Sequence, residues 1–136
     1  KSGPLDFNID LDGVQIIGLD TLVEDEHTGR LTTEQLVWLG EKLSINHHPH
    51  TVVIMHQAPF LTGVGFFDRL NKIEGHEQFA ELIAGAKSDV TLLCGHTHRP
   101  YQALWKGANC YVSGALASQF GGKDPFGDGK SQTGAF

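Results

Sequence analysis

The chain has 136 residues, the size of one domain, and 40% of them are apolar, which is an ordinary content for a globular protein. Acidic residues outnumber basic ones and give a formal charge of −6. Because no stripe of Lys or Arg is present, a nucleic acid polymer is not expected as a partner. No stretch approaches the roughly 20 apolar residues of a membrane span, and the first residues lack a signal-peptide pattern, so we expect a cytoplasmic protein with no membrane partner.

A β-hairpin is predicted near the start of the chain, with strands at residues 7–10 and 14–19. The Asp12-Gly13 pair between them is a strong turn signal. A polar loop then covers residues 24–29. We therefore expect the first two strands to be antiparallel neighbours.

A helix is predicted to begin after Thr32. Thr32 can act as the N-cap and Gln35 as its capping-box partner, because this pair satisfies two backbone N–H groups at the start of a helix. Apolar positions recur at helical spacing up to about Leu43, and the helix must end before Pro49.

The rest of the chain combines apolar runs with one further helical pattern. A second helix is predicted at about 75–86 from its apolar stripe, and from Ser118 onward the sequence is rich in Gly and poor in aliphatic residues. Because helices separate the main apolar runs, those strands should pair in parallel. The predicted strands are residues 51–56, 90–95, 101–105 and 109–113, with a turn at Lys106-Gly107 between the last two.

Three histidines follow the ends of two apolar runs. His56 ends the run that begins at Thr51, and the run from Val90 leads into Gly95-His96-Thr97-His98. Open α/β sheets bind ligands beyond the carboxyl ends of their strands, so these imidazoles should meet at one edge of the sheet. Imidazole is a common ligand of transition metals. We therefore predict that His56, His96 and His98 are metal ligands.

The order of these pieces resembles the calcineurin-like metallophosphoesterases. The pieces are a strand leading to His, a helix, a strand leading to Gly-His-x-His, and an antiparallel return. The branch that hydrolyses cyclic nucleotides and small phosphodiesters is the most similar. The resemblance implies an α/β fold, with a mixed sheet and helices, that forms half of a four-layer αββα sandwich. Residues 1–117 are then the carboxyl-terminal part of a catalytic domain, and residues 118–136 a Gly-rich tail or arm.

The resemblance also implies a chemistry. In the intact parent enzyme, a metal-bridging hydroxide would hydrolyse a cyclic nucleotide or related phosphodiester at two divalent ions of zinc, iron, manganese or cobalt. His56 and His96 match ligands of one ion, and His98 matches a ligand of the other. The earlier family motifs Asp-x-His, Gly-Asp-x-x-Asp and Gly-Asn-His-Asp do not occur in the sequence. We therefore assign no catalytic residue, and we expect the chain alone to be inactive and to hold fewer metal ions or none.

Three residues are predicted to contact the small phosphodiester substrate. Arg99 is adjacent to His98, while Asp68 and Asn71 lie in the loop that covers the substrate in enzymes of this kind. Asp20, at the end of a predicted strand, is interpreted as a turn residue, with support of a metal ligand as the alternative.

The remaining cysteines and histidines have simpler interpretations. Cys94 and Cys110 lie on neighbouring predicted strands, so a disulfide is conceivable, but buried and inert thiols are expected. His27 and His76 are interpreted as surface residues. The tract from His47 to His50 is interpreted as a solvated loop, with a metal-binding tract as its alternative.

A non-catalytic function is the competing hypothesis. The chain could be an α/β module that binds at most one metal ion and associates through its sheet edge. The strands at 51–56 and 90–95 are apolar on both faces, as in sheets covered on both sides, yet the chain supplies only two clear helices. A homodimer formed through exposed sheet edges or exchanged segments is therefore expected.

Overall fold

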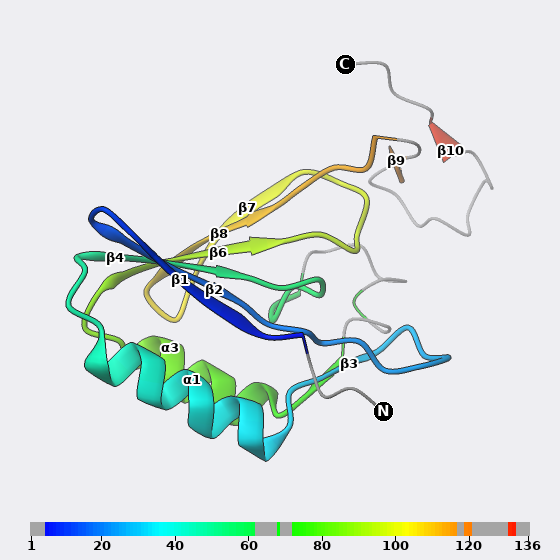
Figure 1. Ribbon diagram of the computed structural model, residues 1–136. Helices are drawn as coiled ribbons and strands as arrows, with labels where there is room; N and C mark the ends of the chain where they lie inside the picture. The colour runs from blue at the N-terminus through cyan, green and yellow to red at the C-terminus, as the bar shows by residue number, and fades with distance from the viewer. Residues whose placement is uncertain (1–4, 62–67, 69–71, 117–118, 121–130, 133–136) are drawn as a thin grey trace.

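The computed structural model describes residues 5–61, 68, 72–116, 119–120 and 131–132. Within these ranges, six strands form one mixed sheet in the spatial order β1-β2-β4-β6-β8-β7. The four central strands are parallel, and a hairpin adds an antiparallel strand at each edge (Figure 1). This arrangement confirms the expected α/β fold with a mixed sheet. The strands are β1 Phe7–Leu11, β2 Val14–Gly18, β4 His50–Ile54, β6 Asp89–Cys94, β7 Tyr101–Trp105 and β8 Ala108–Val112.

Short turns with left-handed residues close both hairpins. Lys106 and Gly107 between β7 and β8 have φ values of 52° and 84°, as a type I′ turn requires. At the other edge, Gly18 is paired with Phe7, and a side chain at position 18 would overlap the Phe7 ring. The absence of a Cβ at Gly18 therefore allows the aromatic ring to lie across the sheet.

Two helices cover one face of the sheet, side by side (Figure 1). Helix α1 spans Thr33–Ile45 and begins with the predicted capping box: Gln35 N–H donates to Thr32 Oγ1 at 3.2 Å, and Thr32 N–H donates to Gln35 Oε1 at 2.9 Å. Helix α3 spans His76–Ala84, slightly shorter than its apolar stripe indicated. Within the described ranges, neither helix has the length and apolar content needed to cross a bilayer.

A second, small sheet was not predicted. Strand β3, Gly29–Arg30, pairs in parallel with β5, Ile73–Glu74, and Arg30 Nε lies 2.6 Å from Glu74 Oε2. Two-residue strands have no measurable periodicity, so a pattern search does not detect them. Inside the predicted arm, β9 (Gln119–Phe120) and β10 (Ser131–Gln132) form an antiparallel pair.

The two faces of the sheet differ in burial. On the helix side, Val53, Leu92 and Cys110 are fully buried and belong to the hydrophobic core. On the opposite side, Ile54, Leu93 and Tyr111 are 39–42% exposed. The strands are therefore apolar on both faces, as the sequence predicted, but the described residues place helices on only one of them.

Candidate functional site

The candidate site lies where β4 and β6 end. The two strands are parallel neighbours, with Ile54 paired to Leu93, and their hydrogen bonding continues past the last strand residues. Met55 N–H donates to Leu93 O at 3.1 Å, and Gly95 N–H donates to His56 O at 2.9 Å. The backbone ladder therefore places His56 directly beside the turn that carries His96.

The Gly95-His96-Thr97-His98 turn has an unusual backbone. His96 and His98 both have positive φ values, 69° and 54°, which residues other than Gly rarely adopt. Thr97 N–H donates to Gly95 O at 2.8 Å and closes a three-residue turn around His96. Thr97 is fully buried beneath this turn. Strained backbone of this kind occurs most often at functional sites.

His56 and His96 contact each other through their ring nitrogens. His96 Nδ1 lies 3.2 Å from His56 Nε2, and the rings are edge-on, with centroids 5.0 Å apart. Burial, followed by the nearby imidazoles of His56, His27 and His98, lowers the pKa of His96 to about 4. Burial and then the charge of His98 lower the pKa of His56. Both rings are therefore neutral near pH 7, which is the form that binds metal ions.

The structure brings two of the three predicted ligands into contact. His98 follows in the same turn and influences the pKa of both other histidines. Among the described residues, no group of three or more His, Cys, Asp or Glu side chains is arranged to hold a metal ion. The donors fit a metal ion in chemical type and protonation state, but the set is incomplete. Metal binding by His56, His96 and His98 thus stays a prediction.

The predicted substrate residues are only partly placed. Arg99 is half-buried directly after the turn, and its backbone carbonyl lies 3.4 Å from the Thr97 hydroxyl. Asp68 is also half-buried, in a helical conformation. Asn71 lies outside the described residues. Their contact with substrate remains a prediction.

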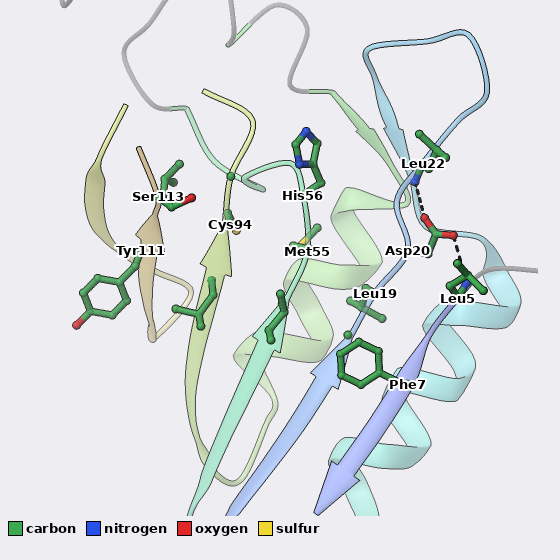
Figure 2. A pocket seen from close by; sticks show the side chains of 15 residues that line it. Leu5, Phe7, Leu19, Asp20, Leu22, Met55, His56, Cys94, Tyr111 and Ser113 are labelled. Carbon is green, nitrogen blue, oxygen red and sulfur yellow. Dashed lines mark hydrogen bonds between the residues drawn. The ribbon is translucent and has the colours of Figure 1, made fainter. Parts of the chain in front are cut away.

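Asp20 acts as a turn residue. Its carboxylate accepts hydrogen bonds from the backbone N–H groups of Leu22 at 3.0 Å and Leu5 at 3.2 Å, as the dashed lines in Figure 2 show. These bonds tie the residues before β1 to the end of β2. They agree with the simpler of the two interpretations of Asp20.

An open apolar cleft of about 720 Å³ lies beside His56, on the sheet face opposite the helices (Figure 2). Phe7, Leu93 and Tyr111 are among the residues that line it, and His56 is at the end nearest the strand termini. The cleft thus joins the candidate site to the sheet face that the described helices do not cover.

Sequence reasoning was wrong about His76 and incomplete about His27. His76 is half-buried: its Nε2 lies 2.7 Å from Pro59 O, and its ring packs against Trp105. His27 is exposed, yet it contributes to lowering the pKa of His96, which indicates that its loop approaches the site. Both facts depend on contacts between distant segments, and the local sequence carries no signal for them.

The cysteines behave as predicted. Cys94 and Cys110 are both buried and are not joined by a disulfide. Burial, with the neighbouring Cys110 as a smaller cause, raises the pKa of Cys94 to about 12, and burial raises the pKa of Cys110 to about 11. Neutral thiols of this kind are unreactive.

Known phosphodiesterases match most of the chain. No family model matches it. A probable glycerophosphodiester phosphodiesterase of Arcobacter nitrofigilis is 32% identical over 92 residues, which cover 68% of this chain and 34% of that protein. A 3',5'-cyclic adenosine monophosphate phosphodiesterase of Vibrio vulnificus is 27% identical, covering 78% of this chain and 38% of that protein. A cAMP/cGMP dual specificity phosphodiesterase of Mycobacterium tuberculosis is 32% identical, over a match that covers 82% of this chain and 35% of that protein.

A mixed sheet with histidines at the ends of two adjacent parallel strands defines an α/β protein whose candidate ligand site lies at that edge. The matched phosphodiesterases narrow this class further. The chain belongs to the calcineurin-like phosphoesterase family, in the group of cyclic-nucleotide and glycerophosphodiester phosphodiesterases. It spans between 34% and 38% of the length of these three relatives.

Proposed function

We propose that this chain forms the carboxyl-terminal part of a metal-dependent phosphodiesterase catalytic domain. The observation that carries the proposal is the contact between His56 and His96, two neutral imidazoles held 3.2 Å apart at the ends of adjacent parallel strands. The phosphodiesterase names of the matched relatives support the same chemistry. The substrate would be a cyclic nucleotide or a related small phosphodiester.

The three histidines would hold the metal ions. His56 and His96 would bind one divalent ion, and His98 would bind the second, with zinc, iron, manganese or cobalt as candidates. When bound, the ions would supply Lewis acidity to the phosphoryl oxygens and an activated water. Arg99, Asp68 and Asn71 would contact the substrate. The acidic chain would then need few cations of its own to neutralise the phosphate.

The chain alone would not be an active enzyme. Three neutral imidazoles give two divalent ions no carboxylate to balance their charge, and missing ligands reduce metal affinity steeply. The remaining ligands would come from the part of the relatives' length that the chain does not span. That part would also cover the apolar sheet face opposite α1 and α3.

A test compares this chain with an amino-terminally extended parent protein. Both are assayed with bis(p-nitrophenyl) phosphate and cyclic AMP, and their bound metal is measured by mass spectrometry. We expect turnover and two metal ions per protomer only in the parent. Parent-like turnover by the chain alone would show that its three histidines suffice, and a parent that binds no metal and hydrolyses neither substrate would refute the proposed function.

The alternative is a non-catalytic module that binds at most one metal ion and associates through its sheet edge. Strands β1 and β7 form the two edges of the described six-stranded sheet, which supports this alternative. One metal ion per protomer, no turnover in the parent, and a stable homodimer would together favour it.

A further inference from the structure

Gln57 is a buried polar residue immediately after His56. Its side chain is 4% exposed, and Thr21, at the other end of its hydrogen bond, is 2% exposed. The Thr21 hydroxyl donates to Gln57 Oε1. Buried polar side chains require partners, and loss of one partner leaves the other unsatisfied. The bond therefore links the side chain of the residue after His56 to the segment after β2.

Gly29 encloses Gln57 from a second direction. A Cβ at position 29 would lie 2.9 Å from Gln57 Oε1 and 3.0 Å from Gln57 Cδ, so the amide end of the Gln57 side chain would have to shift to admit it. The segment is itself held in place, because Arg30 N–H donates to Thr21 O at 3.1 Å. Gln57 therefore occupies a defined slot between Thr21 and Gly29.

We propose that Thr21 and Gln57 are positioning residues for His56. His56 lies between two fixed points: its own carbonyl accepts the Gly95 N–H at 2.9 Å, and the next residue is anchored by Thr21. Together these contacts direct His56 Nε2 toward His96 Nδ1. The consequence for metal binding rests on the proposed function, but the geometry of the histidine pair can be tested without any metal.

The test uses the metal-free chain in EDTA and nuclear magnetic resonance. The readout is the nuclear Overhauser cross-peak between the ring protons of His56 and His96, whose centroids are 5.0 Å apart. Thr21→Val removes the hydroxyl at nearly constant volume, and Thr21→Ser retains it. Gly29→Ala displaces Gln57 while leaving Thr21 intact. Thr51→Val is the matched control, because Thr51 is a fully buried Thr at the opposite end of β4 with hydrogen-bond partners of its own.

We expect Thr21→Val to lose the cross-peak and Thr21→Ser to keep it. Thr51→Val should lower thermal stability while retaining the cross-peak. An intact cross-peak in folded Thr21→Val would overturn the proposal, because the pair would then contribute only stability. If Thr21→Val does not fold, Gly29→Ala decides: loss of the cross-peak supports the positioning role, and its retention refutes it. These outcomes do not depend on whether the parent binds metal or hydrolyses phosphodiesters.

Discussion

Two histidines separated by one residue adopt left-handed backbone conformations in the turn after β6, and this conformation is sterically unfavourable for both. A left-handed residue with a Cβ costs about 1–2 kcal/mol relative to its ordinary conformation, and His96 and His98 both adopt it. Gly at either position would avoid this cost, whereas Ala would not. The imidazole side chains are therefore placed on a backbone conformation that favours Gly.

A pair of substitutions isolates the backbone contribution at His98. His98→Gly and His98→Ala both remove the imidazole, so their difference in stability reports the backbone conformation at residue 98 together with the greater freedom of Gly in the unfolded chain. We expect the Gly variant to be more stable than the Ala variant by about 1 kcal/mol, as measured by urea unfolding. Equal stability of the two variants would show that residue 98 does not keep its φ of 54° in solution.

The histidine pair gives the most direct test of the candidate site in the proposed parent enzyme. His56→Ala or His96→Ala should reduce bound metal and lower kcat by more than about 100-fold, because loss of a group that only hydrogen-bonds to a metal ligand already costs about 10- to 100-fold. His47→Ala is the control, since His47 is exposed and lies before β4 rather than after it. Near-normal turnover with full metal content in either test variant would remove that residue from the site.

The buried thiols predict a loss of stability in alkaline solution. The pKa of Cys94 is raised from 9.0 to about 12, so the unfolded chain releases its thiol proton at lower pH than the folded chain does. As the pH rises above 9.0, ionisation favours the unfolded state and the free energy of unfolding falls. Urea titrations should show a steeper decline for the natural chain than for Cys94→Ala. Parallel declines would mean that burial does not hold the thiol in its neutral form.

Gln35 has two roles at the start of α1. Its side chain completes the capping box, and its Nε2 donates to Asp20 O at 2.8 Å and to Asp6 Oδ1 at 3.0 Å. Gln35→Ala should destabilise the chain by about 1–3 kcal/mol, because it leaves buried groups without partners. The matched control is Gln78→Ala on the exposed side of α3, which should change stability by less than about 0.5 kcal/mol. Similar effects of the two substitutions in urea unfolding would contradict this role of Gln35.

The elements that the sequence predicted are those with a local cause. The capping box at Thr32 and the hairpin turn at Gly107 depend on residues only a few positions apart, so their patterns are visible in the chain. The meeting of His56 and His96 could also be predicted, because the ends of parallel strands lie at one edge of a sheet.

Other contacts could not be predicted, because they join distant segments without a repeating pattern. The β3–β5 pair and the bond between Thr21 and Gln57 are of this kind. The packing of His76 against Trp105 depends on where a hairpin and a helix meet, which no spacing rule reveals.

The sheet face that the described helices leave open determines how the chain behaves by itself. Leu93 and Ile54 are each 39% exposed on a face that the described helices do not cover. Large exposed apolar patches promote association, so the chain alone should form a homodimer or a larger assembly. Leu93→Lys should weaken this association and keep stability within about 0.5 kcal/mol.

Light scattering over a dilution series measures this association. Leu92→Lys is the control, since Leu92 is fully buried on the helix side and its replacement should unfold the chain instead. A natural chain that stays monomeric at all concentrations would refute the expected association. Association that persists unchanged in Leu93→Lys would indicate contact through the edge strands β1 and β7.

The connections between the strands also set the order in which the molecule assembles. The edge hairpins join neighbouring segments and can form in about 1–10 μs, whereas the central pairs β2–β4 and β4–β6 must each first close a long loop that contains a helix. Pairing of distant segments makes folding slower, on the order of milliseconds to seconds in sheet-rich domains. His56 and His96 lie beyond the ends of β4 and β6, so they meet only after this slow step. A newly made chain would therefore complete the hairpins at both edges of its sheet before the edge that carries the histidine pair exists.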